Sequence, residues 1–461
     1  MTKNDFEFLE KIVGKDNFFS GENVSEDYHK DELRTIIKAP HCVIKVENVK
    51  DISKIMTYAN EKKIPVTVRG SGTGLVGSCV AVYGGIMLDM TKMDKIIELD
   101  EKNMTLTLEP GVLLMNIYEY VEPKGFFYAP DPGEKSATIG GNISTNAGGM
   151  RAVKYGVTRD WIMGLEVVLA SGEIINVGGK VQKDSSGYSL KHLFIGSEGT
   201  LGIITKVIVK LLPLPKESLS ILMPFPSAKE AIAAVPKIKQ SKIIPCAIEF
   251  FEKGTLVFAE EYLGKKFPDK NNTSYILLTF DGNSREQVES DYKKVADLAL
   301  TDLKALDALI VDTKERKDAV WQTRGSFLEA IKSSTTNIDE CDVVVPVSEI
   351  DSYLRFTYDL AKKHKIRIPS FGHAGDGNLH IYLCQDDMSP EEFSKRLDVV
   401  FDLMYKKAFE VGGLVSGEHG IGYAKKKYLL EQVGPTQIAI MQGIKKSFDP
   451  NNILNPGKIC Q

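Results

Sequence analysis

Cysteine is scarce in this sequence, and its spacing excludes two kinds of metal site. The 461 residues include six cysteines, scattered along the chain: Cys42, Cys79, Cys246, Cys341, Cys384 and Cys460. None forms the Cys-x-x-Cys spacing that is typical of iron-sulfur clusters and structural zinc sites. If the protein carries out redox chemistry, its electron carrier is therefore not a cluster bound by cysteine.

Long apolar runs are also missing. The uninterrupted ones, such as Ala231–Val235, are far shorter than the roughly 18 residues that a membrane-spanning helix needs. The N-terminal stretch MTKNDFEFLEKIVG mixes charges of both signs with apolar residues, a pattern closer to an amphipathic helix than to a signal peptide. We expect a soluble, cytoplasmic protein without a membrane span.

The sequence has no large excess of either charge. Its 58 Lys and Arg residues stand against 62 Asp and Glu residues, a net charge of -4, and the basic residues are interspersed. This argues against nucleic acid as a partner. The length predicts two domains or three lobes rather than one core. A cluster of prolines, which resists regular structure, predicts a boundary: Pro213, Pro215, Pro224 and Pro226.

A glycine-rich loop is the first informative motif. A predicted helix over 49–61 and a predicted strand over 65–69 lead into RGSGTGLVGS. Gly70, Gly72 and Gly74 allow the backbone to approach a ligand closely, which suits phosphate binding. A plain connection between strands would have a similar composition. Because no long helix with G-x-G-x-x-G spacing follows, a Rossmann-type dinucleotide fold is disfavoured.

A second glycine-rich block, PDPGEKSATIGGNISTNAGG, spans 130–149. Its small and polar residues cannot pack an apolar core, and it is longer than an ordinary connection of roughly 4 to 6 residues. We expect loop backbone wrapped around a large polar ligand. Further along, the sequence favours strands over 247–251, 275–280 and 378–384 and helices over 286–300 and 391–411.

The stretch GHAGDGNLH brings two of the seven histidines, His373 and His380, close together in the sequence. It is either a tight surface turn or a pair of nitrogen ligands at a fixed distance. Glu418 and His419 follow in SGEHGIG, 38 positions after His380. They are either a solvated loop pair or the remainder of a set. Two imidazoles, a carboxylate and a further group would suit a metal site with a base.

Several motifs in order carry a specific resemblance: RGSGTGLVGS, the block at 130–149 followed by RAVKYG, GSEGTLGIIT, and the ending NPGKI. From about residue 40 onward the chain resembles the FAD-dependent vanillyl-alcohol oxidase and p-cresol methylhydroxylase superfamily. Within it, the chain is similar to the branch of D-lactate dehydrogenases, glycolate oxidase flavin subunits and D-2-hydroxyglutarate dehydrogenases.

The resemblance implies an α+β fold in three parts. These are a two-subdomain FAD-binding domain over 1–215, a cap domain with an antiparallel sheet over 216–410, and a C-terminal segment over 411–461. The last segment would return to the flavin and complete the metal site.

The resemblance also implies which residues bind FAD. The loop 70–74 would hold the pyrophosphate, the second block and Asn455 the flavin, and 198–204 the adenine side. Since no histidine stands in 69–78, we expect the FAD to be non-covalent. The full set is Arg69, Gly70, Ser71, Gly72, Thr73, Gly74, Ser136, Thr138, Gly140, Gly141, Asn142, Thr145, Asn146, Gly148, Tyr155, Glu198, Gly202, Ile203, Ile204, Asn378 and Asn455.

By the same resemblance, His373, His380 and Glu418 bind a divalent metal and His419 is the base. Zinc fits two nitrogens and one oxygen, and iron or manganese would fit too. Arg324, in WQTRGSFLEAI, matches the arginine that holds the substrate carboxylate, for which a bidentate guanidinium is suited. The other interpretation of Arg324 is an exposed helix residue.

These parts predict oxidation of a small 2-hydroxy acid, with its hydroxyl proton passing to His419 and its hydride to the flavin. The acidic residues Asp339, Glu340 and Asp342 would repel a second carboxylate. D-lactate is therefore favoured, followed by glycolate, with D-2-hydroxyglutarate as an alternative.

With no cluster ligands in the chain, the reduced flavin needs a partner, and an electron-transferring flavoprotein is favoured among the acceptors that the relatives use. A flavin-carrying relay subunit and a non-oxidative flavoenzyme of the ether-lipid synthase kind are the alternative functions. The sequence leaves the roles of Arg151, Lys154 and Cys460 open.

Overall fold

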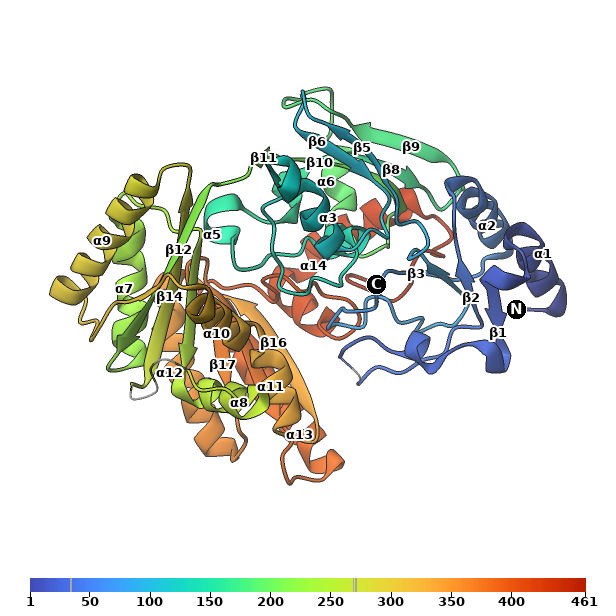
Figure 1. The fold of residues 1–461 in the computed structure, drawn as a ribbon. Helices are drawn as coiled ribbons and strands as arrows, with labels where there is room; N and C mark the ends of the chain where they lie inside the picture. The colour runs from blue at the N-terminus through green and yellow to red at the C-terminus, as the bar shows by residue number, and fades with distance from the viewer. Residues whose placement is uncertain (34, 268, 270–271) are drawn as a thin grey trace. The chain divides into compact units, whose positions relative to one another are not determined.

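The structure is a computed structural model that describes residues 1–33, 35–267, 269 and 272–461 (Figure 1). It divides into two compact units, each with its own sheets. Unit 1 comprises residues 1–148, 157–214 and 418–461, and unit 2 comprises residues 149–156 and 215–417. None of the helices in the described parts of the chain combines the length and apolar character that a bilayer crossing requires.

The first sheet of unit 1 has the order β1-β2-β4-β3, with β2 and β3 parallel to β4 and β1 antiparallel to β2. Its strands are β1 (Phe18–Ser20), β2 (Cys42–Lys45), β3 (Val66–Arg69) and β4 (Ile86–Asp89). Helices α1 (Lys3–Val13) and α2 (Val49–Lys62) pack against it through an apolar core. The predicted N-terminal amphipathic helix, the helix over 49–61 and the strand over 65–69 are confirmed.

The second sheet of unit 1 is antiparallel, with the order β5-β6-β10-β8-β9. Its strands are β5 (Ile96–Asp100), β6 (Thr105–Leu108), β8 (Ile162–Val168), β9 (Ile174–Gly178) and β10 (Ile203–Lys210). The remaining short strands pair with each other, β7 (Phe126–Phe127) with β11 (Leu212–Pro213). The other α-helices of this unit are α3 (Leu114–Val121), α4 (Ile139–Thr145), α6 (Leu190–Phe194) and α14 (Lys426–Phe448).

The second glycine-rich block corrects one expectation. It was expected to be loop throughout, but residues 139–145 form helix α4. Thr138 is the N-cap, and its side chain accepts a hydrogen bond from the N–H of Gly141. Asn146 ends the helix in the left-handed conformation, at φ 55°. The low helix propensity of its two glycines hides this helix in the sequence, whereas its two caps define where it begins and ends.

Unit 2 is built on one antiparallel sheet of seven strands, in the order β15-β12-β14-β13-β17-β18-β16. The strands are β12 (Glu217–Phe225), β13 (Ala247–Glu252), β14 (Ser274–Gly282), β15 (Leu309–Val311), β16 (Ile338–Val344), β17 (Ser370–His373) and β18 (Asn378–Cys384). The strands predicted at 247–251, 275–280 and 378–384 are confirmed within one or two residues.

Helices cover both faces of this sheet (Figure 1). They are α5 (Ala152–Tyr155), α7 (Ala228–Gln240), α8 (Lys253–Leu263), α9 (Arg285–Asp302), α10 (Lys314–Gly325), α11 (Phe327–Ser333), α12 (Ile350–His364) and α13 (Pro390–Glu410). Side chains of α8, α10 and α11 share one apolar core with Phe251 and Tyr382 of the strands. The helices predicted over 286–300 and 391–411 correspond to α9 and α13.

The first glycine-rich loop yields a stability prediction. A Cβ on Gly70 would lie 2.1 Å from the Thr138 Oγ1, whereas a Cβ on Gly74 would have the Asp31 Oδ2, at 3.7 Å, as its nearest neighbour. Overpacking of this kind costs about 1–3 kcal/mol. We therefore expect Gly70→Ala to lower the thermal midpoint of the FAD-free protein by at least about 2–4 °C. Gly74→Ala, the matched control, should change it little, and equal midpoints for the two variants would contradict the packing argument.

Candidate functional site

One face of the seven-stranded sheet carries both predicted histidine ligands. Side chains alternate between faces along a strand, so the registers determine which residues share a face. Those on the face of His373 and His380 include four polar residues: Glu249, Glu340, Asp342 and Asn378. This is also the face covered by α8, α10 and α11, so the polar group lies beside an apolar core.

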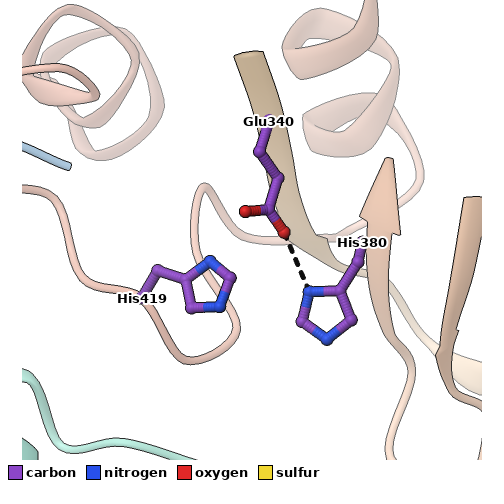
Figure 2. Close-up of side chains that lie close together, drawn as sticks. All are labelled: Glu340, His380 and His419. Carbon is purple, nitrogen blue, oxygen red and sulfur yellow. Dashed lines mark hydrogen bonds and ion pairs between the residues drawn. The ribbon is translucent and has the colours of Figure 1, made fainter. Parts of the chain in front are cut away.

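Each histidine is oriented by a carboxylate. The Nδ1 of His373 lies 2.8 Å from Glu249 Oε1, and the Nδ1 of His380 lies 3.0 Å from Glu340 Oε1. Figure 2 shows the second pair, with Glu340 on β16 and His380 on β18. A carboxylate at Nδ1 favours the tautomer with its proton there and directs a lone pair outward from Nε2. The two Nε2 atoms lie 3.4 Å apart.

Glu249 is held from a second side by Arg324. The guanidinium donates to Glu249 Oε2 through Nε, at 2.8 Å, and through Nη2, and it lies over the ring of Phe371 at 4.6 Å. Arg324 is 7% exposed and Glu249 is fully buried, so the alternative of an exposed helix arginine is wrong. Burial raises the pKa of Glu249, but the interactions with His373 and Arg324 outweigh burial and hold it below its usual value.

Sequence reasoning missed Glu249. It stands in the strand AIEFFE, whose composition indicates a buried core. A carboxylate in such a strand is costly to bury without partners. Its presence in an apolar run was therefore the signal that it has a buried partner. The position of His373 opposite it depends on a strand pairing that the sequence does not disclose.

The acidic residues of β16 are also engaged. Asp342 accepts hydrogen bonds from the Asn378 amide, at 2.7 Å, and from the Ser416 hydroxyl, at 2.7 Å. The carbonyl of Asp342 accepts from the N–H of Gly417. Glu418 and His419 are the next residues along the chain, so the bonds of Asp342 anchor the segment that leads into them.

Two members of the predicted metal set, His373 and His380, lie together within unit 2, with Glu340 against His380 (Figure 2). The third member, Glu418, and the predicted base, His419, are neighbours in unit 1. His419 Nε2 lies 3.7 Å from Glu418 Oε1. Glu418 is 8% exposed and His419 is partly buried, so the alternative of a solvated loop pair does not hold for Glu418.

In unit 1, the segments predicted to bind FAD are tied together. The Ser71 hydroxyl donates to the carbonyl of Ser136, at 2.6 Å, which joins the two glycine-rich segments. Ser78 donates to the Glu198 carboxylate. Asn455 donates through its amide to the carbonyls of Ser78 and Glu198, at 2.8 Å each. The first loop, the turn at 196–200 and the C-terminal segment therefore share one set of hydrogen bonds.

The Glu198 carboxylate also binds the C-terminal segment. Its carboxylate accepts from the N–H groups of Ile421 and Gly422, both at 2.8 Å, and so fixes the chain just after His419. Burial raises the pKa of Glu198 despite these bonds. Glu418 packs closely against Gly148, where an added Cβ would lie 2.8 Å from Glu418 Oε2.

Several other residues of the predicted FAD-binding set make contacts within their own unit. The Tyr155 hydroxyl donates to Asp281, at 2.8 Å, and Lys154 forms an ion pair with the same carboxylate. Arg69 donates to backbone carbonyls of residues 27 and 30. Three further members lie near the start of β10: Gly202 faces Val167 and Phe194, and Ile203 and Ile204 are buried in the strand.

Comparison with known proteins assigns the chain to a family. Residues 40–178 match the family model described as FAD binding domain, and residues 214–459 match FAD linked oxidases, C-terminal domain. The chain belongs to the FAD-linked oxidase family. It is an FAD-dependent oxidoreductase.

Relatives align along nearly the whole chain. A D-lactate dehydrogenase of Anaerostipes hadrus is 46% identical, over 98% of this chain and 97% of its own. The glycolate oxidase subunit GlcD of Bacillus subtilis is 40% identical, over 100% and 97%. A D-2-hydroxyglutarate dehydrogenase of Stutzerimonas stutzeri is 30% identical, over 94% and 93%.

Solved structures confirm the predicted fold. p-Cresol methylhydroxylase with substrate bound has a TM-score of 0.79 at 19% identity, over 100% of this chain and 98% of its own. Alkyldihydroxyacetonephosphate synthase has a TM-score of 0.77 at 18% identity, over 99% and 85%. The α+β fold of the p-cresol methylhydroxylase type, with its antiparallel sheets, is therefore as expected from the sequence.

The pairing of Arg324 with Glu249 yields a stability prediction. Removing one partner of a buried ion pair leaves an uncompensated charge, which costs about 3–5 kcal/mol. We expect Arg324→Met and Glu249→Met each to lower the free energy of unfolding by that amount, and the double variant to lose clearly less than the sum. Urea unfolding of the three variants measures the coupling.

Arg316 on the same helix supplies the control. It lies 3.5 Å from Asp312, and both side chains are exposed. Arg316→Met should change stability by less than about 0.5–1 kcal/mol. Additive losses in the Arg324 and Glu249 cycle would show that the buried contact is not energetically coupled.

Asp31 yields a pH prediction. Its carboxylate accepts from the N–H of Gly77, at 2.6 Å, and burial raises its pKa to about 6. An unfolded Asp has a pKa of about 3.9, so between pH 4 and 6 the folded state binds more protons. The contribution of Asp31 to stability therefore falls as pH rises through this window, by about 3 kcal/mol in total.

The Asp31→Asn variant isolates this effect. Both proteins are measured without FAD. As pH rises from 4 to 6.5, the unfolding free energy of the natural protein should fall relative to that of Asp31→Asn. Exposed Asp16, changed to Asn, is the control for removal of a surface carboxylate. A difference for Asp31→Asn that does not change with pH would contradict the raised pKa.

Proposed function

We propose that this oxidoreductase uses non-covalent FAD and a divalent metal to oxidise a small D-2-hydroxy acid, most favourably D-lactate to pyruvate. The names of three relatives support this substrate class: a D-lactate dehydrogenase, a glycolate oxidase subunit and a D-2-hydroxyglutarate dehydrogenase. Glycolate and D-2-hydroxyglutarate are the alternative substrates. We assign the loop 70–74 to the FAD pyrophosphate, and no histidine stands in 69–78 for a covalent link.

The observation that carries the metal assignment is the facing pair of Nε2 atoms on His373 and His380. With both Nδ1 atoms at carboxylates, two lone pairs face each other across 3.4 Å. Such an arrangement is unfavourable unless a proton or a cation lies between them. Two ligands at about 2.0–2.1 Å from a tetrahedral zinc would lie about 3.3–3.4 Å apart. The residues present therefore fit zinc, with Glu418 as the oxygen ligand, and iron or manganese accept the same donor set.

The chain's own residues would share the remaining tasks. A bound divalent metal would lower the pKa of the substrate hydroxyl, and bound FAD would accept the hydride. His419 would take the hydroxyl proton, since an imidazole accepts protons near neutral pH. Arg324 would attract the substrate carboxylate with the guanidinium edge that Glu249 does not occupy. Glu249 and Glu340 would keep both histidines in the tautomer that ligation requires.

The surroundings of the site favour a monocarboxylate. Glu340 and Asp342 are buried next to His380, and a second substrate carboxylate at this place would be repelled by them. A short side chain such as the methyl group of lactate carries no such penalty. This reasoning ranks D-lactate and glycolate above a dicarboxylate.

Electrons must leave the flavin after each turnover. We propose an electron-transferring flavoprotein as the acceptor and a cytoplasmic setting for the reaction. The second candidate function is a flavin-carrying relay subunit, which the subunit name of the Bacillus subtilis relative favours. A relay subunit would not need the carboxylate-oriented histidine pair.

Anaerobic reduction of the flavin tests the proposal. D-lactate should bleach the flavin absorbance of the purified protein rapidly, L-lactate should not, and chelation should abolish the reaction while FAD stays bound. Readdition of zinc, iron or manganese identifies the metal, and metal analysis of the protein supplies a readout independent of turnover. Bleaching that is unaffected by complete metal removal would refute the metal's role.

A variant separates the dehydrogenase from the relay subunit. His419→Ala should retain FAD and lose at least about a hundredfold in the rate of flavin reduction by substrate, because a general base contributes about 10²–10⁴-fold. Reduction by dithionite should be unchanged. If no 2-hydroxy acid reduces the natural protein with FAD and metal present, the relay function is to be preferred.

A further inference from the structure

Lys458, in the ending NPGK, is a buried cation that the proposed chemistry does not use. Its exposed fraction is 0%. The ammonium donates to the carbonyl of Gly77, to that of Ser78 at 3.3 Å, and to that of Val80 at 2.7 Å. All three carbonyls belong to the end of the first glycine-rich loop and the turn that follows it.

The charge of Lys458 is not neutralised by a direct ion pair within the described residues. Lys445, another buried lysine of the C-terminal segment, also donates to backbone carbonyls but differs because it forms an ion pair with Asp449 at 2.5 Å. Burial lowers the pKa of Lys458 to about 8, so it remains largely cationic at neutral pH. The carboxylates of Glu198 and Asp31 favour this charge from a distance but form no direct ion pair with it, so an anion bound at the loop would stabilise it further.

The backbone is constrained to keep Lys458 in place. Ile459 adopts φ 57°, which is unfavourable for a β-branched residue, and its N–H donates to the carbonyl of Gly422 at 3.0 Å. On the other side of the loop, the Asp31 carboxylate accepts from the N–H of Gly77. Gly77 is thus held through its carbonyl by Lys458 and through its N–H by Asp31.

We propose that Lys458 is a positioning residue for FAD: it fixes the end of the loop 70–78 and supplies the positive charge behind it that favours the pyrophosphate. The inference rests on the assignment of this loop to the pyrophosphate and is independent of the proposed substrate and metal. Lys458 acts through the loop, because its donors already bind the three carbonyls.

Binding measurements with the full-length, FAD-free protein test this role. Lys458→Gln removes the charge but keeps hydrogen-bond donors, and Lys458→Arg keeps the charge. Lys426, which is partly exposed and donates to the Gly457 carbonyl at 3.3 Å, gives the control Lys426→Met in the same turn. FAD is titrated by flavin fluorescence, and ADP and adenosine serve as competitors with and without a pyrophosphate.

Lys458→Gln should weaken the binding of FAD and of ADP by about tenfold or more, as expected for loss of a unit charge in a medium of effective dielectric about 20. The affinity for adenosine should not change. The FAD affinities of Lys458→Arg and Lys426→Met should stay within about threefold of that of the natural protein. The inference would be overturned if Lys458→Gln bound FAD as tightly as the natural protein does, or if Lys458→Gln and Lys458→Arg lost the same amount of FAD affinity. Failure of ADP to compete in the natural protein would instead refute the pyrophosphate assignment of the loop.

Discussion

The polar face of unit 2 depends on the contacts that the Glu249 carboxylate makes. This carboxylate is fully buried, and it touches Arg324 from helix α10 and His373 from strand β17. An isolated carboxylate at that depth would be protonated or would destabilise the fold. With both partners present it stays ionised, and it fixes the orientation of each. The geometry of His373 is therefore determined by an anion that belongs to the core rather than to a loop.

The histidine pair follows from that constraint together with strand register. His373 and His380 are on neighbouring strands of one hairpin, and each meets its carboxylate across a different strand pair. A shift of one residue in either pairing would move the histidine to the opposite face. The apolar partners of the same registers, such as Phe371 and Tyr382, resist that shift because they would leave the core. Packing of ordinary hydrophobic residues thus secures the 3.4 Å separation of two nitrogens.

Much of this could be predicted from the sequence because the informative signals are local. The strand and helix periods, the two glycine-rich segments and the spacing of His373, His380 and Glu418 are visible in short stretches, and the order of motifs indicated the family. Glu249, Lys458 and helix α4 were not predicted. The first two act through contacts between segments far apart in the sequence, and the third is defined by capping bonds that outweigh the low propensity of its glycines.

Glu198 and Lys458 show how a loop of small residues acquires a defined shape. Glycine backbone has many accessible conformations, and fixing it costs conformational entropy. Here the cost is offset by charged groups outside the loop that bind its hydroxyl groups and the carbonyls at its end: Glu198 binds Ser78, and Lys458 binds Gly77 and Val80. Charge-assisted hydrogen bonds are strong and directional when buried. The loop can therefore keep the open backbone that a large polar cofactor needs, because its order is imposed by residues outside it.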